Sequence, residues 1–310
     1  MRATAALPQR GFHSMRVYRA TTDEVPNGKT AGDVADRAAV ARFHSVVWGY
    51  WKREGRYGLP WRRTKDPYKI LVSEVMLQQT QVERVVPFYK NFLKQFPHVK
   101  CLASSSLAST LQCWSGLGYN RRARFLRDAA REIVKKHGGR VPKDAAALRA
   151  LSGVGDYTAK AVRVFAWNEP EVLIETNIRT TCMHHFHSNV LPACAEASAG
   201  RQNVRMSDKE IFPLMAEAAK GQDPREWHWA LMDYGAHLKK RGVRLNAKSA
   251  HYMKQSKFEG SLRQARGEVL RSLLCGEMFD LRGRTYTKAL AGLAKDGLIE
   301  RRGAKWYVAG

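Results

Sequence analysis

The chain of 310 residues has no apolar stretch near the roughly 18 residues that a membrane-spanning helix requires, so we expect no membrane association. Cysteine is also scarce. The five cysteines stand at positions 101, 113, 182, 194 and 275, and no two of them form a CxxC pair. An odd number of widely spaced cysteines argues against a disulfide framework and a cysteine-based metal site. It indicates reduced thiols in a cytoplasmic protein, associated with the nucleoid if the source is bacterial.

Acidic residues are few. The chain has 28 Asp and Glu against 53 Lys and Arg, a formal charge of +25. Ribosomal and membrane-surface proteins carry similar charge, but 44% of the residues are apolar, which is enough for a real core. A polyanion is the partner that a positive field attracts most strongly, so we expect nucleic acid as the partner.

The first residues lack acids and a hydrophobic face. Residues 1–22 contain four arginines and no Asp or Glu. A transit peptide has a similar composition. We favour a basic, disordered arm over residues 1–35, or an upstream mis-start with Met15 as the true first residue.

Apolar periodicity predicts a domain made of helices over residues 36–255. The predicted helices are 36–57, 67–81, 82–96, 107–114, 120–137, 145–151, 157–167, 207–219 and 224–238. No alternating pattern typical of a strand occurs before residue 280. We therefore expect an all-α fold.

The tail, residues 256–310, has a different pattern. SLRQARGEVLRSLL and TYTKALAGLAKDG predict two helices, and residues 298–308 resemble a β-hairpin that turns at Gly303. Helices followed by a hairpin resemble a small winged-helix module. Such a module either binds DNA or braces the neighbouring domain, and the sequence leaves both open.

The stretch LSGVGDYT at 151–158 places two glycines between two predicted helices. Glycine permits a tight turn, and the first amides of the following helix can then face a phosphate. An ordinary corner between helices is the alternative for the two glycines alone. The whole pattern resembles the helix-hairpin-helix motif, which grips the DNA backbone without reading sequence. Its residues are Leu151, Gly153, Val154, Gly155 and Thr158.

Longer stretches resemble a known family. LPWRRTKDPYKILVSEVMLQQTQVERVVPFYKNFLKQFP at 59–97, WSGLGYNRRAR at 114–124 and ALMDYGAHL at 230–238 are similar to the helix-hairpin-helix DNA glycosylase superfamily, specifically its MutY-type adenine glycosylases. The resemblance implies a two-lobed all-α fold, a monomer, and double-stranded DNA with a mispaired or damaged base as partner. It also implies excision of adenine opposite 8-oxoguanine or G.

Two carboxylates suit this chemistry. Breaking an N-glycosidic bond requires a proton for the leaving base and a negative charge near the sugar cation, as in glycoside hydrolysis. By resemblance, Glu74 in SEVMLQQTQ is the general acid. Its apolar neighbours favour the protonated form of a carboxyl group. The alternative is a solvated charge on a helix.

The second carboxylate is Glu175 in VLIETNIRTT. The family has Asp at this position, so the side chain here is one methylene, or about 1.5 Å, longer. Misplacement by about 1 Å can cost about 100-fold in rate. The alternative interpretation is that Glu175 only interacts with the dipole of a helix N-terminus.

The resemblance assigns further residues. Gln78, Gln79 and Tyr119 would enter the duplex, and Asn120 stands where relatives often have a second aromatic residue. Trp61, Arg62 and Asp233 would line the base pocket. Bifunctional relatives have a lysine nucleophile at the position of Tyr157, so we expect a monofunctional enzyme. The residues expected at the DNA backbone, besides the hairpin, are Arg121, Arg122, Lys239 and Lys240.

Two departures from the family matter. Most members hold a [4Fe–4S] cluster with four cysteines after the ALMDYGA segment, but HLKKRGVRLNAKSAHYMKQSKF has none. The chain resembles the iron–sulfur-free branch, and we expect no cofactor. MutY-type enzymes also usually carry a Nudix-like domain that checks for 8-oxoguanine, where this chain has the winged-helix-like tail.

Two other functions stay open. One is a glycosylase that removes thymine or uracil opposite G on the same scaffold. Glu74 argues against it, because pyrimidine removal has less need of this acid. The other is a non-catalytic binder of damaged DNA. The joint presence of the family's residues argues against it, namely Glu74, Gln78, Gln79 and Tyr119.

Overall fold

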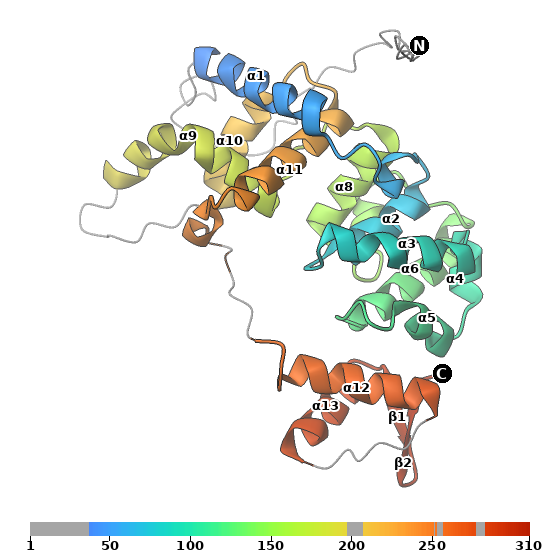
Figure 1. The fold of residues 1–310 in the computed structure, drawn as a ribbon. Coiled ribbons are helices and arrows are strands. Elements are labelled where there is room, and N and C mark those ends of the chain that lie inside the picture. The colour runs from blue at the N-terminus through green and yellow to red at the C-terminus, as the bar shows by residue number, and fades with distance from the viewer. Residues whose placement is uncertain (1–36, 197–206, 251, 253–256, 277–282) are drawn as a thin grey trace, which may run out of the picture. The chain divides into compact units, whose positions relative to one another are not determined.

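The computed structural model describes residues 37–196, 207–250, 252, 257–276 and 283–310. The basic arm predicted at 1–35, with Met15, lies outside the described residues. Contacts divide the chain into two units (Figure 1). The first contains the chain up to Gly55 together with Asn168–Ala250, and the second contains Arg56–Trp167 together with the chain from His251. The domain boundary predicted near residue 256 stays a prediction.

The first unit is helical throughout its described residues. Its core is aromatic: Trp227 is fully buried, and the ring of Phe43 lies edge-on to it at 5.7 Å and to Phe186 at 5.0 Å. Three helices therefore share one core. The elements are α1 (Arg37–Glu54), α9 (Thr176–Glu196), α10 (Asp208–Ala219), α11 (Pro224–Lys240) and the 3₁₀ turn η3 (Leu245–Lys248).

The second unit is built around helix α2 (Pro67–Leu77), which packs against α8 and α3. Every residue from Ile70 to Met76 is buried, as expected for a helix enclosed on all sides. The unit also contains η2 (Pro60–Arg62), α3 (Val82–Gln95), α4 (Val99–Ser104), α5 (Leu107–Trp114), α6 (Arg121–His137), α7 (Ala145–Arg149), α8 (Asp156–Trp167), α12 (Leu262–Cys275), α13 (Arg284–Lys295), β1 (Ile299–Arg302) and β2 (Lys305–Val308).

The predicted all-α class is confirmed. Among the described residues the only sheet is the terminal hairpin, in which β1 pairs antiparallel with β2 and Ile299 faces Val308. The hairpin contacts α12 and α13, so the tail has the winged-helix-like order of elements. No helix in the described part of the chain combines the length and the apolar character needed to cross a membrane.

Three details differ from the sequence prediction. Helix α2 ends at Leu77 rather than at 81, because Gln79 has a positive φ of 56° that no α-helix accommodates. Helices α4 and α9 were not predicted, since α4 is a single short turn and α9 has no apolar period. Helix α1 ends at Glu54 rather than at 57.

Candidate functional site

Glu74 lies in the middle of α2. The helix begins sharply because Pro67 takes the first position and the Asp66 carboxylate accepts from the Tyr68 amide at 2.9 Å. Glu74 is 7% exposed, among Val72 and Val75, which are 0% and 4% exposed. Glu74 is therefore buried, as is every residue from Ile70 to Met76. In general, burial favours the protonated form of a carboxyl group, which is the form able to donate a proton.

The residues expected to enter the duplex project from two loops. Gln79 and Tyr119 have φ of 56° and 50°, a left-handed conformation that is uncommon for residues other than glycine. Both side chains are exposed, Tyr119 to 37%. Gln78 differs, because its Nε2 donates to Thr158 Oγ1 at 3.4 Å on α8. Strained backbone of this kind persists only where the surroundings hold it.

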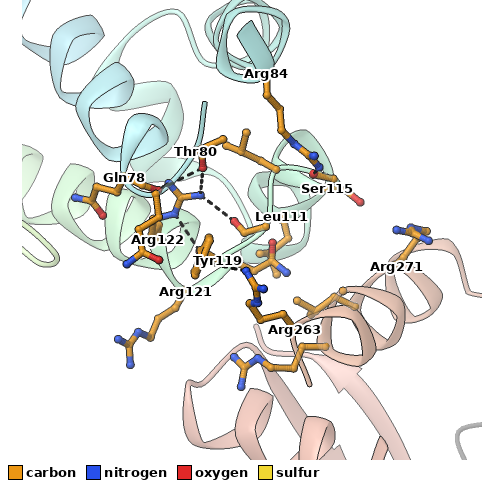
Figure 2. Close-up of a pocket in the computed structure, with 18 of the residues that line it drawn as sticks. Gln78, Thr80, Arg84, Leu111, Ser115, Tyr119, Arg121, Arg122, Arg263 and Arg271 are labelled. Carbon is orange, nitrogen blue, oxygen red and sulfur yellow. Dashed lines mark hydrogen bonds between the residues drawn. The ribbon is translucent and has the colours of Figure 1, made fainter. Parts of the chain in front are cut away.

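Hydrogen bonds from the Arg122 side chain hold much of this backbone in place (Figure 2). Its Nη1 donates to the carbonyl oxygens of Val75, Met76 and Gln78 at 2.8, 2.9 and 2.6 Å. The last carbonyls of a helix have no partner within the helix. A side chain from α6 therefore satisfies the end of the helix that carries Glu74.

The same guanidinium holds the second loop. Arg122 Nη2 donates to Thr80 Oγ1 at 3.2 Å and to the Gly118 carbonyl at 3.0 Å, and Nε donates to the Tyr119 carbonyl at 3.4 Å. The group also lies over the rings of Trp114 and Tyr119, 5.4 and 5.3 Å from their centroids. Desolvation lowers the pKa of Arg122 to about 10, which leaves the side chain charged at neutral pH. The sequence interpretation placed Arg122 at the DNA backbone, but its donors are directed at protein acceptors.

We expect Arg122→Ala to lower the free energy of unfolding by about 2–4 kcal/mol, because several buried carbonyls lose a charged donor. Chemical denaturation followed by circular dichroism measures the change. Arg121→Ala removes the same charge from the neighbouring position, where the side chain is 59% exposed and 3.5 Å from Asp296. This control should cost less than about 1 kcal/mol. Equal losses in the two variants would contradict the assignment.

The hairpin expected at the DNA backbone has the predicted form. Leu151 and Val154 are 3% and 6% exposed, and Thr158 is buried in α8. Gly153 has a φ of 73°, and a Cβ there would lie 2.6 Å from the Cβ of Phe125. Only glycine therefore fits this turn. Gly155 is exposed directly before α8, at the end of the helix whose first amides can face a phosphate.

The remaining candidate site residues of the second unit are Trp61, Arg62 and Tyr157. Trp61 is 6% exposed and its ring lies edge-on to Tyr89 at 5.4 Å. Arg62 is half-buried, and its Nη1 donates to the Arg56 carbonyl at 3.3 Å. Tyr157 is half-buried in the first turn of α8. Lys160, the nearest lysine on that helix, forms an ion pair with Asp156 at 3.0 Å.

Glu175 belongs to the first unit, where it precedes α9. Its Oε1 accepts from the amides of Asn177 and Ile178 at 2.8 and 2.9 Å, and its Oε2 accepts from Asn177 Nδ2 at 3.2 Å. The carboxylate thus caps the helix and lies at the positive end of its dipole.

Two residues of α11 fix the segment on either side of this cap. Gly235 touches the start of α9 so closely that a Cβ would lie 2.2 Å from the Asn177 carbonyl oxygen. The His228 ring accepts the Leu173 amide at Nε2, at 3.0 Å, and its Nδ1 lies 2.6 Å from the Pro224 carbonyl. These contacts require a neutral ring with its proton on Nδ1. The position of Glu175 is therefore set by helix packing.

His228 makes this unit sensitive to acid. Burial lowers the pKa of its ring to about 4, against about 6.5 in an unfolded chain. Between these values the unfolded state binds more protons, so stability should fall as the pH drops from about 6.5 to 4, by on the order of 3 kcal/mol. Urea unfolding across this range measures the slope. His228→Gln, which accepts the Leu173 amide but does not titrate, should flatten the slope. An unchanged slope would contradict this account.

The remaining candidates of the first unit lie on α11. Asp233 is 2% exposed, Lys239 is half-buried and Lys240 is exposed. Desolvation lowers the pKa of Lys239, and the charge of Glu175 opposes this shift. The two lysines end the helix, where they also complement its dipole.

The loop after α11 does not fit an iron–sulfur cluster, which requires thiolates. Residues 236–258 include no cysteine. Polar bonds hold the described part of the loop: Arg244 Nη1 donates to the Lys239 carbonyl at 3.0 Å, and Arg179 Nη1 donates to Asn246 Oδ1 at 3.4 Å. Within the described ranges no group of three or more His, Cys, Asp or Glu side chains could hold a metal ion.

Sequence reasoning missed the positioning residues His228 and Gly235 and the inward direction of Arg122. Of these three residues, only Gly235 could have been identified from the sequence. Glycine inside a helix costs about 1 kcal/mol relative to alanine, so its place within ALMDYGAHL indicates a close approach.

Part of the chain is similar to known proteins. Residues 72–213 match the HhH-GPD superfamily of base excision DNA repair proteins. The adenine DNA glycosylase of Buchnera aphidicola subsp. Baizongia pistaciae is 38% identical over 194 residues, 63% of this chain and 52% of its own. That of Mycobacterium tuberculosis is 34% identical over 187 residues, 60% of this chain and 58% of its own. The chain spans about half the length of these relatives.

The structure of a thermostable thymine-DNA glycosylase has a similar fold, with a TM-score of 0.54 and 26% identity over 64% of this chain and 87% of its own. The resemblance found in the sequence is thereby confirmed. The matched region contains Glu74, Glu175 and the hairpin, and over this region the chain is similar to the HhH-GPD superfamily of base excision DNA repair proteins.

Proposed function

We propose that the protein is a monofunctional DNA glycosylase that excises mispaired adenine, opposite 8-oxoguanine or G, and leaves an abasic site. It acts as a monomer on double-stranded DNA. The observation that carries the proposal is the buried Glu74 at the centre of α2. Its place in a region similar to adenine DNA glycosylases supports a role as proton donor to the leaving purine.

The mechanism needs two carboxyl groups in different states. Glu74 donates a proton to the adenine ring, which makes the base a better leaving group. The Glu175 carboxylate, held in place by three hydrogen-bond donors, stabilises the positive sugar. Gln79 and Tyr119 occupy the space that the flipped nucleotide leaves in the stack. The ion-paired Lys160 supports hydrolysis rather than a lysine intermediate.

A thymine or uracil mismatch glycosylase is the second candidate. Similarity to the fold of a thymine-DNA glycosylase favours it. The same scaffold serves both reactions, so the fold does not decide between them.

Single-turnover reactions separate these functions. The duplexes carry A, T or U opposite G or 8-oxoguanine, and alkali converts abasic sites into strand breaks. We expect excision of A, with breaks only after alkali. Excision of T or U without A would establish the second candidate, and binding without any excision would identify a damaged-DNA binder. Breaks formed without alkali would contradict the monofunctional assignment.

A further inference from the structure

A groove in the second unit joins the exposed loops to α12. Figure 2 shows residues that line it, and its volume is about 880 Å³. One wall is formed by Gln78–Gln81 and Ser115–Arg122, which include both left-handed residues. The other wall is one face of α12, whose lining residues recur at helical spacing: Arg263, Arg266, Gly267, Leu270, Arg271 and Leu274. The two walls bring residues far apart in sequence into one site.

Positive charge dominates the lining. Six arginines line the groove: Arg84, Arg121, Arg122, Arg263, Arg266 and Arg271. Asp296 is the single acidic residue among the lining residues. It is already paired with Arg266 and lies 3.5 Å from Arg121, so it orients these arginines and neutralises only part of their charge. A groove with this balance attracts an anionic ligand.

Exposed aromatic rings accompany the arginines. Phe258 is 62% exposed, and the Arg263 guanidinium lies 5.9 Å from its ring centroid. Arg263 Nη1 also donates to the Tyr119 hydroxyl at 3.3 Å. Cations that follow a groove, next to aromatic faces open to solvent, are the combination that holds a nucleic-acid strand: phosphates pair with the cations and bases stack on the rings.

We propose that this surface, the arginine groove, binds one strand of the DNA beside the point where Gln79 and Tyr119 enter the duplex, and that Phe258 stacks on a base of that strand. The inference rests on the proposed function for its DNA partner. It makes the winged-helix-like module part of the DNA-binding surface, in which α12 supplies phosphate contacts. Such contacts position the duplex without reading its sequence.

Gly267 provides a sharp test, because a Cβ at this position meets nothing within 4 Å. Gly267→Glu therefore places a negative charge in the groove without a steric clash, and replacing glycine inside a helix favours folding. Ala291→Glu is the matched control, since it makes the same charge change at an exposed position of α13 outside the groove. Thermal unfolding checks that both variants fold.

Affinity is measured by fluorescence anisotropy on a labelled duplex with 2′-fluoro-adenosine opposite 8-oxoguanine, which binds but resists excision because fluorine destabilises the sugar cation. We expect Gly267→Glu to weaken binding by about 10-fold or more, and Ala291→Glu by less than about 3-fold. Equal affinity of the two variants would overturn the arginine groove. If Gly267→Glu does not fold, Arg271→Gln is tested instead. The loss of one phosphate contact should reduce the magnitude of the slope of log affinity against log salt by about 0.9. An unchanged slope would overturn the proposal.

The readout separates this inference from the proposed function. If the wild-type protein binds DNA but excises nothing, the proposed function fails and the groove test still applies. If wild-type excision is normal and Gly267→Glu binds as Ala291→Glu does, the arginine groove alone fails.

Discussion

Glu74→Gln should lower the single-turnover rate of adenine excision by about 10²–10⁴-fold, the usual contribution of general acid catalysis. The amide has nearly the same shape as the carboxylic acid but is no acid at neutral pH. Because Glu74 is 7% exposed, an isosteric change keeps the packing of α2 while removing the transferable proton. The rate is measured with enzyme in excess over a duplex carrying A opposite 8-oxoguanine.

Glu83→Gln is the control for this experiment. Glu83 is exposed in the first turn of α3, and the control makes the same chemical substitution of an amide for a carboxyl group. Its excision rate should equal that of the wild type. Anisotropy should give similar DNA affinity for both variants. A near-normal excision rate in Glu74→Gln would remove Glu74 from the chemistry.

Glu175→Gln should lower the excision rate by about 10²–10³-fold, the loss expected when a preorganised charge near a developing cation is removed. The variant also separates the two roles considered for this residue. Gln keeps an oxygen that can accept from the amides of Asn177 and Ile178, so the helix cap should weaken by only about 1 kcal/mol. A variant that loses that much stability but keeps its excision rate would show a cap without catalytic function.

Glu175→Asp completes the comparison. Asp is a strong helix cap, and its shorter side chain keeps the negative charge. We expect this variant to retain most of the excision rate that Glu175→Gln loses. Chemical denaturation and single-turnover kinetics on the same samples distinguish lost stability from lost chemistry.

Amphipathic sequence was enough to predict most helices. The basic helix α6 has a continuous apolar face, and its end at Gly138 could be predicted as well, since the structure shows a left-handed cap with φ of 60°. Helix α9 could not be predicted in this way. Its first turns are rich in Thr and His, with no apolar period, and it is stabilised by packing against α11.

The place of Glu74 within a helix could be predicted, because it stands in a motif with an apolar pattern, whereas the catalytic roles of Glu74 and Glu175 stay predictions. The role of Arg122 could not be predicted, because nothing in GLGYNRRAR distinguishes an inward arginine from its exposed neighbours. Its function arises only where the end of α2 meets the loop at Gly118. The burial of an arginine depends on acceptors contributed by distant parts of the chain, and a local pattern does not contain them.

The close contact at Gly235 has a consequence for the entropy of binding. With His228, it orders the segment around Leu173 and Asn177 as part of the folded unit. Ordering a backbone costs about 1–2 kcal/mol for each residue. Here that loss of conformational freedom occurs during folding. DNA that binds afterwards meets a carboxylate already in position, and its affinity is not reduced by a further ordering step.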